Sequence, residues 1–310
     1  MQIGILEPMG FDADAAAGLS RLGAVARYEG GDLGRFLAPL NVLFVRLAFD
    51  IDKEFLKLAP GLRYLCSPTT SHTHLDETAL SAGKVELISL RGHRSFLETV
   101  RATPEHTFGL ILALLRRYKM ALTHVDSGGW NRDLFRGEEL FGQTVGIIGL
   151  GRVGRCVARY CSVFGARVVY YDRVSVEAED KWRLLPDIRS VIDAGKIIVL
   201  CASYNNGDPP IIGKKEVAAL TGRYFVNTAR GELVDEPALL AAIADRRLAG
   251  VATDVISDET GNNRLADWRR ASQRENVIVT PHIGGATVTS MARTERFIVD
   301  LLEQRIRATV

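Results

Sequence analysis

Cysteine is scarce in this sequence, and its placement gives no sign of a disulfide framework or a metal site. Cys66, Cys156, Cys161 and Cys201 are scattered through predicted strands and one helix, without the paired spacing of metal ligands. We therefore expect four small buried hydrophobic side chains and no metal, which is typical of the reducing cytoplasm.

An excess of either charge is also missing. The 39 Lys and Arg residues nearly cancel the 37 Asp and Glu residues, which leaves a formal net charge of +2. Binding to nucleic acid or to an anionic membrane surface requires a basic patch, so we expect neither partner. The sequence favours a small-molecule partner instead.

The chain lacks the long hydrophobic runs of membrane proteins and signal peptides. No window approaches the 18 uninterrupted apolar residues of a membrane-spanning helix, and the first apolar run is interrupted at once by Glu7 and Pro8. We interpret that run as a first β-strand and expect a soluble, cytoplasmic protein.

Short apolar runs alternate with helical patterns along the chain, and 310 residues suffice for two α/β domains. Five strands are predicted in the first ninety residues, at 3–6, 24–28, 42–45, 62–66 and 85–88. A loop over residues 91–95 and one long amphipathic helix from Pro104 to Leu122 follow. Six further strands, the number in a doubly wound dinucleotide domain, are predicted at 145–148, 168–171, 197–201, 223–227, 250–254 and 277–280.

The central segment from Thr144 to Asp172 has the pattern of a dinucleotide site. A β-branched run leads into Gly149, Gly151 and Gly154, and a helical stretch follows. The first glycine permits a tight turn, the second lets backbone N–H groups approach a pyrophosphate, and the third lets helix and strand pack closely. A purely structural glycine turn is the alternative, but the strands, helix and acid around it favour nucleotide binding.

Asp172 ends the second strand of this segment, 23 positions after Gly149. A carboxylate there accepts hydrogen bonds from the ribose hydroxyls and repels a 2′-phosphate, which favours NAD over NADP. Arg173 could soften that preference, so acceptance of NADP stays open.

Three polar segments open at or just after predicted strands, and they contribute Arg230, Glu259 and His282 to the carboxyl edge of the sheet. These segments are residues 227–236, 253–259 and 280–287. Oxidation of a secondary alcohol needs a base of near-neutral pKa, which suits His282. Glu259 could fix its tautomer, and Arg230 could hold a substrate carboxylate. Taken singly, each residue also has an ordinary structural interpretation as a core histidine, a turn ion pair or a solvated carboxylate.

Together these motifs resemble the D-2-hydroxyacid dehydrogenase family. The family signatures occur in the same order: a glycine motif, Asn-x-Ala-Arg-Gly, Asp-Val with a following Glu, and Pro-His-x-Gly-Gly-Ala. Arg230 precedes Glu259 by 29 positions and Glu259 precedes His282 by 23, as in family members with an Arg, Glu and His set. The resemblance covers essentially the whole chain, including residues 59–63, 75–76 and 103–107.

The resemblance implies a fold, an activity and an assembly. The fold is α/β with two Rossmann-like parallel sheets: a smaller flavodoxin-like substrate domain (residues 1–98 plus 287–310) and a doubly wound NAD-binding domain (residues 99–286). The activity is hydride transfer at the nicotinamide of NAD between a 2-oxo acid and its D-2-hydroxy acid, with Arg230, Glu259 and His282 catalytic. The assembly is a homodimer built mainly through the cofactor domains.

The resemblance also implies ligand contacts. Asp172 would hold the adenosine ribose, and Asp254 would take the nicotinamide carboxamide. The implied cofactor set is Thr103, Gly149, Gly151, Arg152, Val153, Gly154, Asp172, Thr228, Ala229, Asp254, Gly284 and Gly285. The implied substrate set is Thr70, Ser71, Arg230 and His282.

Two segments depart from the family pattern. Ser71 stands where a glycine usually turns backbone amides toward the substrate, and residues 202–206 replace a usual Pro, Leu and Thr.

His72 and His74 have His-x-His spacing, but no accompanying cluster favours a metal; they shape the substrate pocket or face solvent. Arg46 supports this loop or the substrate's acid group, or forms a surface ion pair. Arg91, His93 and Arg94 could likewise bind a second acidic group or be ordinary surface residues.

An NAD(H)-sensing binding protein, like the corepressors related to this family, is the alternative function. The complete catalytic set favours the enzyme. The sequence does not decide which 2-hydroxy acid is the substrate.

Overall fold

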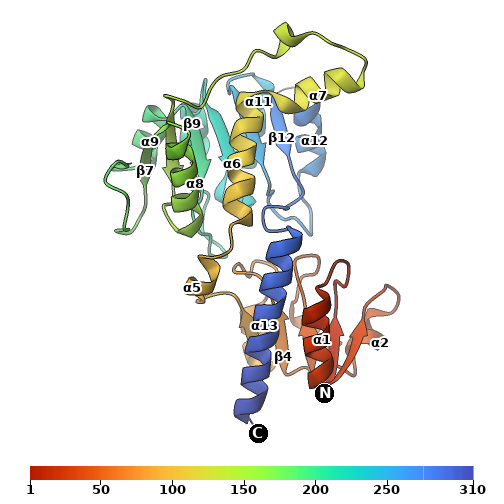
Figure 1. The fold of residues 1–310 in the computed structure, drawn as a ribbon. Helices are drawn as coiled ribbons and strands as arrows, with labels where there is room; N and C mark the ends of the chain where they lie inside the picture. The colour runs from red at the N-terminus through yellow and green to blue at the C-terminus, as the bar shows by residue number, and fades with distance from the viewer. Residues whose placement is uncertain (275, 310) are drawn as a thin grey trace. The chain divides into compact units, whose positions relative to one another are not determined.

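The computed structural model describes residues 1–274 and 276–309. Val310, where the predicted substrate domain ends, lies outside the described residues, as does Glu275. The chain forms two compact units, one of Met1–Val100 with the segment from Ala286 onward and one of Arg101–Gly285. Each unit has its own parallel sheet (Figure 1). The predicted α/β fold class is confirmed.

The smaller unit contains a five-stranded parallel sheet in the order β2-β1-β3-β4-β5, the flavodoxin-like order that was expected. Its strands are β1 Gln2–Ile5, β2 Ala24–Arg27, β3 Val42–Phe44, β4 Tyr64–Ser67 and β5 Glu86–Ser89. Its helices are α1 Ala13–Leu22, α2 Leu33–Leu37, α3 Lys53–Lys57, α4 Glu77–Ala82, α5 Arg94–Leu97 and α13 Val288–Thr309.

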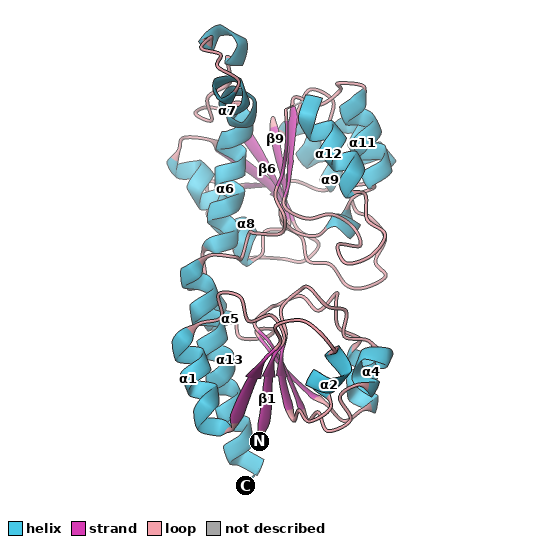
Figure 2. Ribbon diagram, turned by 90° about the vertical axis from the view of Figure 1, so that its right-hand side faces the viewer, coloured by secondary structure: helices cyan, strands magenta, loops and turns pink. Residues whose placement is uncertain are grey.

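Apolar side chains cover both faces of this sheet. Helices α1 and α13 pack on one face and α2, α3 and α4 on the other (Figure 2). Because both faces are buried, the central strands are continuously apolar instead of alternating. The predicted loop over residues 91–95 is wrong in part, since the short helix α5 begins at Arg94.

The larger unit contains a seven-stranded parallel sheet in the order β12-β11-β10-β9-β6-β7-β8. This is the Rossmann order extended by one strand. Its strands are β6 Thr144–Ile148, β7 Arg167–Tyr171, β8 Arg183–Leu184, β9 Ile197–Leu200, β10 Tyr224–Asn227, β11 Gly250–Thr253 and β12 Val277–Val279. The sequence did not predict β8, because two exposed residues at a sheet edge have no hydrophobic periodicity.

Helices cover both faces of this sheet too. They are α6 Ala102–Leu115, α7 Tyr118–Asp126, η1 Arg132–Phe135, α8 Arg152–Val163, α9 Ile188–Ala194, α10 Lys214–Ala219, η2 Gly231–Leu233, α11 Glu236–Ala244 and α12 Leu265–Arg274. Helices α6 and α8 pack on one face, and α9 to α12 on the other (Figure 2). None of the helices in the described part of the chain combines the length and apolar character needed to cross a membrane.

The single long helix predicted from Pro104 to Leu122 is wrong. Helix α6 ends at Leu115, and Arg117 adopts a left-handed φ of 54°, after which α7 starts a new direction. Tertiary packing explains the break: α6 buries residues such as Leu110 and Leu114 against the sheet, whereas the described residues of α7 are all at least partly exposed.

The cysteines are free thiols; Cys66, Cys156 and Cys161 are buried, whereas Cys201 is partly exposed, and Cys156 accepts a hydrogen bond from Arg101 Nη1. Burial raises the pKa of Cys161 and of Cys201 to about 12, which keeps both protonated and unreactive at neutral pH.

Candidate active site

The turn between β6 and α8 has the geometry of a cofactor-binding turn. Gly149 has φ +92°, and a Cβ there would lie 2.7 Å from the backbone of Ala202. A Cβ on Gly154 would lie 2.1 Å from the carbonyl oxygen of Gly149. A Cβ on Gly151, by contrast, would meet nothing within 4 Å. Gly151 therefore leaves open space at the positive N-terminus of α8, which fits the pyrophosphate of a dinucleotide.

Asp172 follows β7, the neighbour of β6, and lies beside this turn. Its Oδ2 accepts a hydrogen bond from the backbone N–H of Leu150 at 2.7 Å, and its Oδ1 accepts one from Val174 at 3.2 Å. A carboxylate has about four acceptor positions, so Asp172 keeps capacity for two ribose hydroxyls. Nearby, burial lowers the pKa of Arg152, the first residue of α8, which remains a cation beside the phosphate position.

Arg230 is fixed by a tight turn after β10. Asn227 donates from Nδ2 to the Arg230 carbonyl at 2.9 Å, and its Oδ1 accepts from the Ala229 N–H at 3.0 Å. Arg230 in turn donates from Nη1 to the Ala229 carbonyl at 2.7 Å. Burial lowers the pKa of this guanidinium, while the nearby Glu259 favours its charged form. The turn thus presents a partly desolvated cation at the carboxyl edge.

Glu259 and His282 form a direct pair at the same edge. His282 Nδ1 lies 2.6 Å from Glu259 Oε2, and the two side chains are 24% and 33% exposed. Because a carboxylate only accepts, the neutral imidazole carries its proton on Nδ1 and its lone pair on Nε2. This is the tautomer that a general base needs. The sequence predicted a pair of these two residues 23 positions apart.

Several predicted nicotinamide-side residues also lie together. Thr107 Oγ1 donates to the Thr103 carbonyl at 2.7 Å and lies 2.7 Å from Thr228 Oγ1. A Cβ on Gly284 would lie 3.5 Å from Thr103 Cγ2 and 2.8 Å from Asp254 Oδ2. Residues from α6 and from the ends of β10, β11 and β12 therefore meet at one place.

The loop that carries Glu259 is supported by residues that the sequence did not reveal. Glu236 is 3% exposed, and its Oε1 accepts from the Ser257 N–H at 2.9 Å and from Trp268 Nε1 at 3.2 Å. Burial raises the pKa of Glu236. A Cβ on Gly231 would lie 2.1 Å from the Ser257 nitrogen, so glycine after Arg230 lets the two backbones touch. In the sequence, Glu236 is only the last residue of the polar segment 227–236.

The predicted substrate loop of the smaller unit follows β4. Thr69 Oγ1 donates to the Ser71 carbonyl at 2.9 Å and lies 2.9 Å from Ser67 Oγ, while Thr70 is exposed. Ser71 is not among the described non-glycine residues with positive φ. The serine is therefore accommodated without left-handed strain. The substrate contacts of Thr70 and Ser71 stay a prediction.

His72 and His74 are buried, so the alternative in which they face solvent is wrong. His72 Nδ1 lies 3.0 Å from Glu77 Oε1, and Arg91 Nη1 donates to the same oxygen at 2.8 Å. Burial lowers the pKa of His72, which favours its neutral form. Among the described residues there is no group of three or more His, Cys, Asp or Glu side chains arranged to hold a metal ion.

Arg46 forms a partly buried ion pair, and the suggestion of a surface pair is wrong. Its Nη2 lies 2.5 Å from Glu295 Oε1, and the Glu295 side chain is only 1% exposed. Arg46 Nη1 also donates to the Met9 carbonyl at 2.8 Å, and Glu295 Oε2 accepts from the Asp12 N–H at 2.7 Å. The pair ties α13 to the loops after β1 and β3.

The larger unit matches a family model described as "D-isomer specific 2-hydroxyacid dehydrogenase, NAD binding domain" over residues 108–284. This match covers more than half of the chain. The chain belongs to the D-isomer-specific 2-hydroxyacid dehydrogenase family. It is accordingly an NAD-dependent oxidoreductase, as the sequence predicted, and the glycine turn and Asp172 fit that cofactor.

Relatives of this dehydrogenase include enzymes with different substrates. Glyoxylate reductase of Thermococcus gammatolerans is 31% identical over 80% of this chain and 74% of its own length. D-3-phosphoglycerate dehydrogenase of Mycobacterium tuberculosis is 31% identical over 86% of this chain, which spans only 49% of that protein. Because these relatives are named as enzymes, an NAD(H) sensor without turnover is not favoured.

Solved structures share the fold. The TT0316 protein from Thermus thermophilus superposes with a TM-score of 0.83 and 25% identity, covering 98% of this chain and 97% of its own. D-lactate dehydrogenase from Aquifex aeolicus, complexed with NAD and lactic acid, superposes with a TM-score of 0.85 and 23% identity, covering 99% of this chain and 96% of its own.

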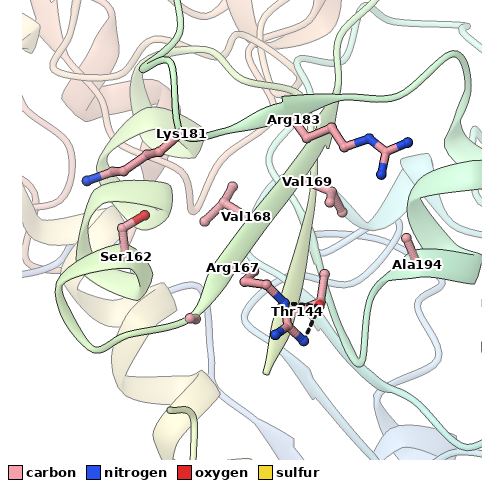
Figure 3. Close-up of a pocket in the computed structure, with 9 residues that line it drawn as sticks. Thr144, Ser162, Arg167, Val168, Val169, Lys181, Arg183 and Ala194 are labelled. Atoms are coloured by element: carbon pink, nitrogen blue, oxygen red, sulfur yellow. Dashed lines mark hydrogen bonds between the residues drawn. The ribbon is translucent and has the colours of Figure 1, made fainter. Parts of the chain in front are cut away.

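A pocket of the larger unit lies at the opposite end of the strands from the glycine turn. It is lined by residues that include Thr144 and Arg167, the first residues of β6 and β7 (Figure 3). Arg167 donates from Nε and Nη2 to Thr144 Oγ1 at 3.3 Å. The candidate site residues of this dehydrogenase instead follow the carboxyl ends of β6, β7 and β10 to β12.

Proposed function

We propose that this dehydrogenase interconverts a 2-oxo acid and its D-2-hydroxy acid, with His282 as the general acid/base. The observation that carries the proposal is the 2.6 Å contact between His282 Nδ1 and Glu259 Oε2 on the unit that matches the NAD-binding family model. The contact directs the lone pair of Nε2 outward from the pair, where it can take a hydroxyl proton. Bound NAD supplies the hydride acceptor, and in the reverse direction NADH supplies the donor.

Glu259 has an orienting and electrostatic role in this proposal. Its carboxylate fixes the tautomer of His282 and stabilises the imidazolium that forms when the ring accepts a proton. Arg230 holds the substrate carboxylate with two parallel N–H donors and polarises the neighbouring oxygen. A partly desolvated guanidinium suits that role, because charge pairs are stronger where water is excluded.

The cofactor contacts remain part of the proposal. The pyrophosphate lies against the glycine turn, with Arg152 and Val153 at the start of α8, and Asp172 accepts from the adenosine ribose. The nicotinamide end is lined by Thr103, Thr228, Ala229, Asp254, Gly284 and Gly285. In the smaller unit, we assign Thr70 and Ser71 to substrate binding. We also propose the domain boundaries predicted from the sequence, with residues 1–98 plus 287–310 as the substrate domain and residues 99–286 as the NAD-binding domain.

A homodimer through the larger unit is also proposed. Helix α7 and the segment after it project beyond the sheet and its covering helices (Figure 1). They expose large apolar side chains, including Leu122 at 64% and Trp130 at 92%. Clustered exposure of this kind marks a partner surface, and we assign it to a second copy of the chain. Light scattering on the purified protein tests this: a monomer at micromolar concentration contradicts it, and Leu122→Asp should convert a dimer to a monomer.

The decisive experiment compares wild-type enzyme with His282→Ala on a panel of 2-oxo acids, each with NADH and with NADPH. We expect wild-type turnover with NADH, and a loss of about 10²–10⁴-fold in kcat for the variant. NADH affinity, measured by fluorescence titration, should survive the substitution. Unchanged turnover in His282→Ala would contradict the assignment, and wild-type silence across the panel despite tight NADH binding would favour the sensor.

A further inference from the structure

His282 has an unusual backbone conformation for a residue with this role. Its φ is +52°, in the left-handed region that side chains other than glycine rarely adopt. A left-handed residue is disfavoured unless its surroundings hold it there. The position of the imidazole therefore depends on the contacts that hold the turn from Thr280 to Gly284.

Asp254 makes those contacts. Its carbonyl oxygen accepts from the His282 N–H at 2.8 Å. Its carboxylate accepts from the next two backbone groups, Ile283 N–H at 2.9 Å on Oδ1 and Gly284 N–H at 2.7 Å on Oδ2. Three consecutive backbone N–H groups thus converge on one residue that is 2% exposed. The turn that carries His282 is folded around Asp254.

Two further side chains hold the Asp254 carboxylate in place. Thr280, just after β12, donates from Oγ1 to Oδ1 at 2.6 Å. His106, from α6, brings Nε2 to 3.3 Å from the same Oδ1 and 3.2 Å from Thr280 Oγ1. Burial alone would raise the pKa of Asp254, but the hydrogen bonds from His106, Thr280 and the turn outweigh it and lower the pKa. The carboxylate stays ionised and keeps accepting.

This arrangement changes the expectation for Asp254. A carboxylate has about four acceptor positions, and four donors are directed at that of Asp254: Thr280, Ile283, Gly284 and His106. Little capacity is left for a ligand such as the nicotinamide carboxamide. Most of the hydrogen-bonding capacity of Asp254 is directed at the turn of His282.

We infer that Thr280 and His106 are positioning residues for catalysis, which act through Asp254 to hold His282 in its left-handed turn. The inference rests on the proposed role of His282 as acid/base. Neither side chain needs to touch the substrate. Loss of either donor loosens the carboxylate, lets the turn relax toward an ordinary backbone conformation, and moves the imidazole away from its productive position.

Paired substitutions test the inference. Thr280→Val keeps the shape and removes the donor, and Thr280→Ser keeps the donor. His106→Phe and His106→Gln form the same kind of pair, because the amide nitrogen of Gln can take the place of Nε2. We expect kcat to fall about tenfold or more in Thr280→Val and His106→Phe. The KM for the 2-oxo acid should change by less than about threefold, since Arg230 is untouched.

The rescue pattern separates positioning from a general structural role. Thr280→Ser and His106→Gln should keep kcat within about threefold of wild type. Thr294→Val serves as the matched control, since Thr294 is a buried threonine in the smaller unit that donates to the Met291 carbonyl. Melting temperatures and NADH titrations are recorded for every variant, so that loss of fold or cofactor is separated from loss of kcat.

Three results would overturn the inference. One is wild-type kcat in both Thr280→Val and His106→Phe. Another is an equal loss in the serine and valine variants, which would mean that the donor is irrelevant. A third is a loss that appears only as weaker NADH binding. If His282→Ala keeps wild-type turnover, the proposed function itself is wrong, and that result differs from the three above.

Discussion

The carboxyl edges of the two sheets both carry charged side chains, but the edges differ in how those charges are satisfied. On the larger sheet, Arg230 follows β10, Asp254 follows β11 and His282 follows β12, and these strands are neighbours. On the smaller sheet, Arg46 follows β3 and is neutralised by the buried carboxylate of Glu295. In the proposed function the first set exchanges protons and holds an anion, whereas the guanidinium of Arg46 is bound to Glu295.

Other charged side chains of the smaller edge are also bound within their own unit. Glu7, after β1, accepts from the backbone N–H groups of Leu47 at 3.0 Å and Ala48 at 2.9 Å, in the loop after β3. Arg91, after β5, binds Glu77. These bonds connect loops to one another and rigidify the edge. Charge at a ligand-binding edge is therefore not itself a sign of chemistry.

The largest expected effect concerns Arg230. Arg230→Ala removes the proposed carboxylate anchor, so kcat/KM for the 2-oxo acid should fall by about 10³-fold or more. The melting temperature should change little, because burial disfavours this charge while the nearby carboxylates of Glu259, Glu232 and Asp254 favour it. Steady-state kinetics and thermal melts on the same preparations check both points.

Arg189→Ala is the matched control for that experiment. Arg189 pairs with Asp193 on the exposed surface of α9, and both side chains are at least half exposed. It should change neither kinetics nor melting temperature noticeably. A large drop in the melting temperature of Arg230→Ala would contradict the division between the two edges.

Arg46 should show the opposite behaviour. Arg46→Ala leaves the Glu295 carboxylate buried and unpaired, which should cost about 3 kcal/mol of unfolding free energy. Urea unfolding measures that cost. Turnover of the folded enzyme should stay within about threefold of wild type, because the guanidinium is committed to Glu295 and the Met9 carbonyl. The double variant Arg46→Met/Glu295→Met should recover part of the loss; a catalytic defect without a stability defect would contradict this account.

Substrate selectivity should depend on the ion pairs of the smaller edge. Arg46 is already paired with the buried Glu295 and Arg91 with the exposed Glu77, so a second anionic group on the substrate would have to compete with these carboxylates. We expect kcat/KM for glyoxylate or pyruvate to exceed that for 3-phosphohydroxypyruvate by about tenfold or more. Arg94, which is exposed at the start of α5, is the check: if the phosphorylated acid wins and Arg94→Ala abolishes its advantage, the smaller edge does offer a working cation.

The sequence predicted features that depend on local chain order. Strand runs, the glycine turn and the Arg230, Glu259 and His282 set are local patterns, and parallel-sheet topology brings their ends together. It could not predict which charges are neutralised from far along the chain. Glu295 lies 249 positions from Arg46, and His106 lies 174 positions from Thr280. The prediction of one continuous helix from Pro104 to Leu122 failed for a related reason, since the packing of α6 against the sheet, and not its local pattern, decides where that helix ends.

The smallest expected effect is the pH dependence from Asp12, in the loop after β1. Asp12 accepts from Arg296 Nε at 2.6 Å and caps α1 through the Ala15 N–H at 2.9 Å. The Arg296 hydrogen bond is the main cause that lowers the pKa of Asp12 from 3.8 to about 2. Because the folded pKa is the lower one, the stabilisation is present above pH 4 and is lost as pH falls through 2.

Solvent reaches this pair, since Arg296 is 49% exposed, so the stabilisation should be about 1 kcal/mol and not the larger figure that the full pKa shift would give. Asp12→Asn keeps a capping oxygen but removes the charge. Its unfolding free energy in urea should fall below that of wild type by this amount at pH 7, and the gap should close near pH 2. A gap that is independent of pH would show that Asp12 acts only as a helix cap. Turnover at pH 7 should be the same in both proteins, because at this edge the charges hold the fold together.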